Sequence, residues 1–171
     1  FGSKNVGTRT VTLTGATLGG ANAGNYSLDH VDTDTAEITA RHLTGSFHAI
    51  DKVYDGGQAA DITNRTLDDV VGTEDVTLAG GTASFASRNV GTWTVTLAGA
   101  ALGGTDKGNY VLDGVTTDTA GITPLGIAGS ITAHTKVYDG NRDASVDASL
   151  SGVLGGDTVD VTPSNAKFDT K

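Results

Sequence analysis

The 171-residue sequence contains no cysteine, no methionine and only two prolines, and aromatic residues make up 5% of it. The lack of cysteine excludes a disulfide framework and a thiolate metal site. No apolar run approaches the ~20 residues that cross a bilayer, and no signal-peptide pattern is present. Because an initiator methionine is missing, we expect this sequence to be a piece of a longer protein or a processed product.

Glycine is abundant, with 25 residues, and threonine and valine recur throughout. Threonine and valine favour strands and glycine favours turns, whereas no stretch has the pattern of a long amphipathic helix. The formal net charge of −9 disfavours binding to nucleic acid or to anionic membranes. Two interpretations of this acidity remain: a solvated face that maintains solubility, which we favour, and binding of divalent cations.

An internal repeat determines the organisation of the chain. The segment Asn5–Tyr26 aligns with Asn89–Tyr110, and the pentapeptide KVYDG at residues 52–56 recurs at 136–140. Both pairs have an offset of 84 residues, from 5 to 89 and from 52 to 136. The sequence therefore predicts a tandem array of one module.

Phenylalanine marks one site of this module three times. Phe1 aligns with Phe85, and Phe85 aligns with Phe168 after the loss of one residue from the last copy. The chain thus spans two periods. Pro124 and the similar stretches AEITARHLTG and AGITPLGIAG suggest where the units meet. We expect half of a preceding repeat at 1–40, a complete repeat at 43–123 and half of a following repeat at 126–171.

The strand signals are short and regularly spaced. Residues 8–14 alternate threonine with larger side chains, and their copy places Trp93, Val95 and Leu97 on one face. Further strands are expected at residues 43–50, 52–54, 75–79, 82–85, 110–112 and 117–123. This pattern predicts an all-β protein of small antiparallel β-sandwich repeats, immunoglobulin-like, with β-grasp-like repeats as the alternative. Such a small unit is marginally stable alone, and stacking on its neighbours would stabilise it.

The KVYDG pentapeptide has a structural and a catalytic interpretation. Asp-Gly is a turn signal, and the preceding tyrosine is a candidate core anchor whose hydroxyl reaches a polar partner. In the alternative the aspartates are acids or metal ligands, but a carboxylate without a neighbouring base or second acid is a poor catalytic unit. We therefore predict turn and anchor roles for Tyr54, Asp55, Gly56, Tyr138, Asp139 and Gly140.

The order of these motifs resembles the YDG repeat family of large secreted bacterial adhesins of the filamentous-haemagglutinin type. The resemblance rests on KVYDG, an ED or GD step at Glu74-Asp75 and Gly156-Asp157, then ASF or AKF, NVGT, VTLAGAALGG, GNYVL and AGITP. It covers essentially the whole chain and carries no catalytic motif. It implies an extracellular stalk or fibre, secreted to the bacterial surface or the surrounding matrix. The first copy departs from the second by Arg41-His42 in place of Pro124-Leu125 and by Arg9 in place of Trp93.

Other residues that could carry chemistry give no recognisable site. None of the four histidines, His30, His42, His48 and His134, recurs in the other copy, and the glycine pairs lack a phosphate-loop pattern. We assign no catalytic, cofactor-binding or metal-binding residue and expect no enzymatic activity. Calcium is the remaining cofactor candidate, on the carboxylates Asp29, Asp32, Asp34, Asp113, Asp118, Asp157 and Asp160, although their spacing matches no known calcium loop.

The two predicted half-repeats are complementary. Each would leave apolar faces and strand edges open. One hypothesis is that the tail of one chain and the head of the next complete a shared domain, so that copies assemble head-to-tail. The alternative is a continuous polypeptide in which neighbouring repeats cover both halves. Trp93 is a candidate inter-repeat contact, with burial inside its own sandwich as the alternative.

These observations favour a structural tandem repeat of an extracellular bacterial fibre or adhesin stalk. A module that binds glycans or host surfaces is the second candidate, although it would need more exposed aromatic residues than 5% aromatics readily supply. A hydrolase is the third candidate and is disfavoured because no catalytic constellation is present.

Overall fold

The computed structural model describes residues 3–169, and over this range the protein is all-β apart from two short 3-10 helices. The elements are β1 (Gly7–Val11), η1 (Ala23–Asn25), β2 (Asp34–Ile38), β3 (Arg41–Ala49), β4 (Lys52–Val53), β5 (Ile62–Leu67), β6 (Thr77–Phe85), β7 (Gly91–Gly103), η2 (Lys107–Asn109), β8 (Tyr110–Val115), β9 (Asp118–Thr123), β10 (Ala128–Ala133) and β11 (Val146–Ser151). Phe1 and Lys171, which belong to the expected repeat sites, lie outside the described residues. None of the helices in residues 3–169 has the length and apolarity needed to cross a bilayer.

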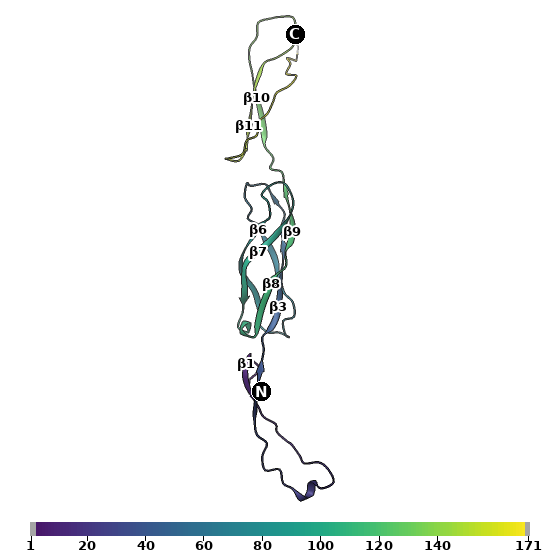
Figure 1. Cartoon of the computed structure of the whole chain (residues 1–171). Coiled ribbons are helices and arrows are strands. Elements are labelled where there is room, and N and C mark those ends of the chain that lie inside the picture. Colours follow the sequence, from purple (N-terminus) through teal and green to yellow (C-terminus); the bar gives the residue numbers. More distant parts are fainter. Residues whose placement is uncertain (1–2, 170–171) are drawn as a thin grey trace.

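The chain forms three bodies in a row (Figure 1). The middle repeat comprises β3 to β9. Below it in Figure 1 lies the N-terminal half-repeat, residues 3–40 with β1 and β2, and above it lies the C-terminal half-repeat, residues 126–169 with β10 and β11. Only residues 39–40 and 124–127 separate the strands at the two crossings. The outer bodies therefore lie at opposite ends of an elongated molecule.

Two sheets form the middle repeat. One has the strand order β5-β3-β8 and the other β4-β9-β7-β6. The expectation of purely antiparallel pairing is wrong for two pairs, because β3 runs parallel to β8 and β4 runs parallel to β9. Parallel pairing needs a long crossover rather than a hairpin. More than sixty residues separate each pair of partners along the chain, so strands from the two ends of the repeat are joined side by side.

The core of the middle repeat lies between these sheets. It is formed by Phe47, Ala49, Ala83, Phe85, Val95, Ala120 and Ile122, from β3, β6, β7 and β9. The predicted face of β7 is confirmed, since Val95 is fully buried and Trp93 and Leu97 pack against the core while the alternate threonines are exposed. Burial on one face with period two is what holds the strand in register.

The N-terminal half-repeat reproduces one half of the middle repeat. The pairing of Gly7 with Ile38 corresponds to that of Gly91 with Ile122, 84 residues later. Strand β1 ends at Val11, so Thr12–Thr14, which belong to the strand predicted at residues 8–14, lie outside the observed strand. The reason is visible in the middle repeat, where β9 pairs with β7 only up to Val95 and the rest of β7 pairs with β6. Within residues 3–169, β1 pairs with β2 alone, and no counterpart of β6 pairs with it.

The C-terminal half-repeat reproduces the other half with one difference. β10 pairs with β11 as β3 pairs with β5, but the β3–β5 ladder contains a bulge between Ser46 and His48 that the β10–β11 ladder lacks. Asn64, in the bulged strand, has a φ of +48°. The residue missing from the last copy is therefore the extra residue of a β-bulge. This explains the change of offset from 84 to 83.

Strand β6 corrects a second expectation. The sequence predicts separate strands at 75–79 and 82–85, whereas one strand runs from Thr77 to Phe85. Gly80 and Gly81 lie in its middle with φ values of +66° and +80°. A Cβ on Gly81 would lie 2.9 Å from a Leu97 methyl group and 3.0 Å from the Ala100 nitrogen. The glycines thus let the strand bend closely around β7 without ending it.

Candidate functional site: the joints between repeats

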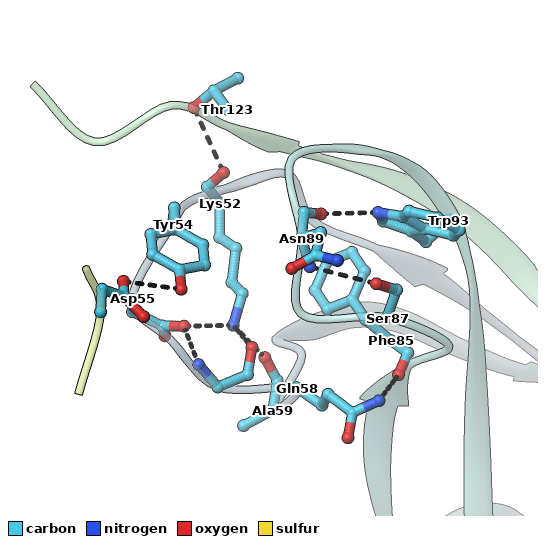
Figure 2. Close-up of polar contacts among 12 residues, drawn as sticks. Lys52, Tyr54, Asp55, Gln58, Ala59, Phe85, Ser87, Asn89, Trp93 and Thr123 are labelled. Carbon is cyan, nitrogen blue, oxygen red and sulfur yellow. Dashed lines mark hydrogen bonds and ion pairs between the residues drawn. The ribbon is translucent and has the colours of Figure 1, made fainter. Parts of the chain in front are cut away.

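The first KVYDG forms a tight, hydrogen-bonded turn (Figure 2). Asp55 Oδ1 accepts hydrogen bonds from the Gly57 backbone N–H at 2.9 Å and from Lys52 Nζ at 2.8 Å. Gly56 adopts a φ of +79°, which glycine tolerates best. The Lys52 ammonium also lies 5.4 Å from the ring centroid of Phe85. The bond from Lys52, supported by the Gly57 amide, lowers the pKa of Asp55, so this carboxylate is ionised and engaged in the turn.

The second KVYDG has the same geometry without the second half of its repeat. Asp139 Oδ1 accepts from Lys136 Nζ at 2.8 Å and from the Asn141 backbone N–H at 3.2 Å, and Gly140 also has a φ of +79°. Lys136 lies 5.8 Å from the Phe168 ring centroid. The bond from Lys136 lowers the pKa of Asp139, as in the first copy. The turn is therefore a local property of the motif.

Tyr54 reaches from its own repeat into the next one. Its backbone N–H donates to the Thr123 carbonyl at 2.9 Å and its half-buried ring packs against the core of the middle repeat. Its hydroxyl donates a hydrogen bond of 2.9 Å to Asp157 Oδ2, in the C-terminal half-repeat. This bond raises the pKa of Tyr54, and burial and the charge of Asp157 act in the same direction.

A cavity of about 240 Å³ surrounds this contact. Its walls come from both bodies and are mainly apolar; they include Tyr54, Val90, Pro124, Leu125, Ile127, Val153, Leu154, Asp157 and Val159. We call the contact between the middle repeat and the C-terminal half-repeat, with the Tyr54–Asp157 hydrogen bond and this cavity, the C-terminal joint.

The N-terminal joint lies at the other end of the middle repeat and centres on Glu74. Its Oε1 accepts from Lys4 Nζ of the N-terminal half-repeat at 2.7 Å, and its Oε2 accepts from the Tyr110 hydroxyl at 2.6 Å. The Tyr110 oxygen in turn accepts from the Val71 backbone N–H at 3.1 Å. The bond from Lys4, followed by that from Tyr110, lowers the pKa of Glu74.

A hydrogen bond from the backbone to a side chain also links the two bodies at this joint. The Val6 backbone N–H donates to Asn109 Oδ1 at 3.1 Å across the joint. A cavity of about 340 Å³ lies beside these groups and is lined by Lys4, Val6, Ile38, Thr39, Arg41, Val71, Glu74, Asn109 and Tyr110.

The two joints are equivalent positions of the repeat. Glu74 aligns with Asp157, with the one-residue deletion taken into account, and Val6 aligns with Val90. Each joint has groups that the other lacks. Within residues 3–169, the C-terminal joint contains the tyrosine of KVYDG but no counterpart of Tyr110 beside Asp157. Over the same residues, the N-terminal joint contains Tyr110 but no KVYDG tyrosine beside Glu74.

Trp93 lies within its own repeat. Its Nε1 donates to the Asn89 carbonyl at 2.7 Å and its ring packs against the core of the middle repeat (Figure 2). Arg9 replaces it in the first copy, and its Nε donates to the Asn5 carbonyl at 3.1 Å. The two side chains differ in chemistry but close the same turn.

The remaining candidate residues form isolated pairs. His42, His48 and His134 each lie beside one aspartate of a neighbouring strand or loop, and His30 lies beside Asp32. Within residues 3–169 no three histidine, aspartate or glutamate side chains gather as metal ligands would. The carboxylates considered for calcium are therefore dispersed over the described part of the chain.

Glu74 and Asp157 are the residues that the sequence did not single out for contact. The signal in the sequence was the acidic step that follows each KVYDG, in which Glu74 aligns with Asp157. The sequence alone did not indicate where in the fold this acidic step lies. In the structure it lies at one end of its repeat, and that end faces the preceding repeat.

The comparisons agree with this repeated architecture. The family described as the YDG domain matches residues 1–36, 39–120 and 123–171. Neither a search of the curated proteins nor a search of the solved structures returned a match. The three matched segments cover nearly the whole length, and the chain therefore belongs to the YDG domain family.

Proposed function

We propose that this chain is a structural tandem repeat of an extracellular bacterial fibre or adhesin stalk, of the filamentous-haemagglutinin type, in which YDG units stack end to end. The observation that carries the proposal is the equivalence of the two joints. The acidic position of one unit, Glu74 or Asp157, receives a side chain of the preceding unit, Lys4 or Tyr54. A contact built from residues of the repeat itself is what a continuing array needs.

The short crossings support a stiff array. Residues 39–40 and 124–127 leave little freedom for two units to move apart, and each crossing is accompanied by a side-chain contact. A rod of this kind separates its two ends by a distance set by the number of units. That property suits a stalk that projects from a surface.

The proposal gives the KVYDG aspartates no catalytic role. Asp55 is bound by Lys52 and by the Gly57 amide, and its lowered pKa makes it a poor proton acceptor at neutral pH. The net charge of −9 suits a solvated, secreted surface. We place the protein on the bacterial surface or in the extracellular matrix on these grounds and on the family resemblance.

For each unit we propose an immunoglobulin-like sandwich. Its two sheets enclose one core, which is the layer arrangement of that class. A β-grasp unit would instead wrap its sheet around a helix. An experimental structure of the middle repeat would decide between these two descriptions.

Two measurements test the stalk proposal. Small-angle X-ray scattering of the chain should give the profile of a rod, with a maximum dimension well above that of one repeat. Electron microscopy of native surface material should show a beaded filament with a regular axial step. A compact particle in the first measurement, or detection of the protein only inside cells, would overturn the proposal.

A further inference from the structure

We propose that the middle repeat is a mechanical clamp that resists tension along the stalk, because a pull on its two ends slides its first strands lengthwise against its last strands. This further function rests on the proposed stalk function, since a stalk transmits any pull through each of its units. The argument concerns β3 to β9, a body with a neighbour at each end in this chain.

Force has one covalent path into the middle repeat and one path out. Residues 39–40 join the N-terminal half-repeat to the start of β3, and residues 124–127 join the end of β9 to the C-terminal half-repeat. These two connections lie at opposite ends of the repeat (Figure 1). Tension between the two neighbours therefore pulls on Arg41 at one end of the repeat and on Thr123 at the other.

Two segments run the length of the repeat in the same direction. We call β3, β4 and the residues between them the first segment, and β8, β9 and the residues between them the last segment. Strand β3 pairs in parallel with β8, starting at Arg41 and Tyr110. Strand β4 pairs in parallel with β9, ending at Val53 and Thr123. A pull on the start of the first segment and on the end of the last segment thus slides one past the other.

The parallel direction decides how the hydrogen bonds between the segments are loaded. These bonds lie across the strands, so a sliding motion strains all of them together. If the first and last strands were antiparallel, both connections would lie at the same end and the bonds would open one after another. Each bond adds little to the equilibrium stability, but breaking several in one step raises the barrier to forced unfolding. Resistance to force depends on that barrier.

Two aspartates link the segments between the two parallel ladders. The Ala49 backbone N–H donates to Asp118 Oδ2 at 2.8 Å, and the Gly121 backbone N–H donates to Asp51 Oδ1. Each bond joins a carboxylate of one segment to the backbone of the other. The bond from Ala49, followed by that from the Thr119 amide, lowers the pKa of Asp118. Hydrogen bonds to a carboxylate are stronger than those between neutral groups, so these two links strengthen the clamp.

Backbone bonds extend the contact at both of its ends. The Thr116 N–H donates to the Gly45 carbonyl at 2.9 Å, and the Tyr54 N–H donates to the Thr123 carbonyl at 2.9 Å. Leu43, in β3, is 1% exposed, so the ladder with β8 has an apolar side chain that keeps water from one face. Bonds that water cannot replace are costly to break under load. The first and last segments are thus joined over the whole length of the repeat.

The direction of pulling tests the clamp in single-molecule force spectroscopy, because the chain has no cysteine and handles can be placed at will. Thr39→Cys with Gly126→Cys pulls at the two natural connections and slides the segments. Thr39→Cys with Lys107→Cys pulls at the end where β3 and β8 both begin and peels them apart. At one pulling rate the first double variant should unfold at about twofold higher force or more, since its bonds break together.

Controls keep this comparison sharp. A Cβ on Gly126 meets nothing within 4 Å, and Thr39 and Lys107 are exposed, so both double variants should have the same thermal unfolding midpoint when followed by Trp93. Equal unfolding forces in the two directions would overturn the clamp and leave the stalk proposal standing. A compact particle in small-angle scattering would overturn the stalk proposal itself.

Asp51→Ala tests one of the two carboxylate links. Loss of its bond to Gly121 should raise the unfolding rate at a fixed sliding force about tenfold and leave the rate in the peeling direction unchanged. Asp61→Ala, at an exposed aspartate outside both segments, is the matched control and should change neither rate. An equal change in both directions, or no change in the sliding direction, would overturn the assignment of Asp51 to the clamp.

Discussion

The hydroxyl of Tyr54 donates a hydrogen bond of 2.9 Å to Asp157, and these two residues belong to successive repeats. The tyrosine of the KVYDG motif therefore acts at the end of its repeat, while the aspartate and glycine beside it shape the turn that presents it. The motif is one half of a joint, and the acidic step of the following repeat is the other half.

Tyr54→Phe should loosen the C-terminal joint and leave the middle repeat folded. The variant keeps the ring in the core and removes only the hydrogen bond to Asp157. Fluorescent labels on Thr94→Cys and Thr132→Cys should report a broader distribution of distances between the two bodies. The unfolding midpoint, followed by the fluorescence of Trp93, should move by less than about 2 °C. Tyr138→Phe, the same change at an exposed tyrosine, is the control and should not broaden the distribution.

Alkaline pH should open the same joint. The hydrogen bond to Asp157 raises the pKa of Tyr54 above its ordinary value of 10.0. Because this pKa is higher in the closed joint than in the open one, the contribution is complete below pH about 10 and is lost as pH rises through the raised pKa. The label distances should thus be constant from neutrality to that point and broaden above it. A transition of equal size in Tyr54→Phe would contradict this explanation.

Lys4→Met should raise the pKa of Glu74. The ammonium of Lys4 is the main cause of the lowered pKa, and the Tyr110 hydroxyl is the second. A carboxylate with a lowered pKa stabilises the joint above its ordinary pKa of 4.5 and loses that effect as pH falls through the lowered value. The side-chain titration of Glu74 by NMR should shift upward in the variant. Lys107→Met is the control, and an unchanged titration in Lys4→Met would contradict the assignment.

Gly45→Val should destabilise the middle repeat by about 2 kcal/mol, because the added side chain overpacks a filled core. Leu78 and Val115 already lie close to the position of a Cβ on Gly45. Thermal unfolding followed by Trp93, the one tryptophan of the chain, reports on this repeat. Gly129→Val, at the aligned position of the C-terminal half-repeat, where a Cβ meets nothing closer than 3.8 Å, is the matched control and should leave this transition unchanged. Equal destabilisation by the two variants would show that the crowding at Gly45 is not the cause.

Periodicity within the sequence was enough to predict the all-β class, the repeat and the buried face of β7. Alternation works where one face of a strand is buried, as for Trp93, Val95 and Leu97. Motifs with local geometry can be predicted in the same way. The Asp-Gly turn forms even at Asp139 and Gly140, although residues 126–169 contain only the first half of that repeat.

Contacts between distant segments could not be predicted in this way. The parallel pairing of β3 with β8 depends on residues far apart in the chain, and β5 has no alternating pattern because a bulge interrupts it. Ile62 and Leu67 are five positions apart, which a regular strand would place on opposite faces. In β11, which lacks the extra residue, Val146, Ala148 and Leu150 alternate cleanly and are half-buried.

Asn64→Val should therefore destabilise the middle repeat by about 1–2 kcal/mol, because a β-branched residue is strained at the φ of +48° that Asn64 adopts. Asn64→Gly should leave the stability unchanged or slightly raised, since glycine reaches this conformation freely. Thr63→Val is the control, at an exposed neighbour with ordinary strand geometry that should tolerate the same side chain. The free energy of unfolding in urea, again followed by Trp93, checks all three. If Asn64→Val and Asn64→Gly are equally stable, the bulge does not require a positive φ, and the one-residue difference between the copies needs another physical cause.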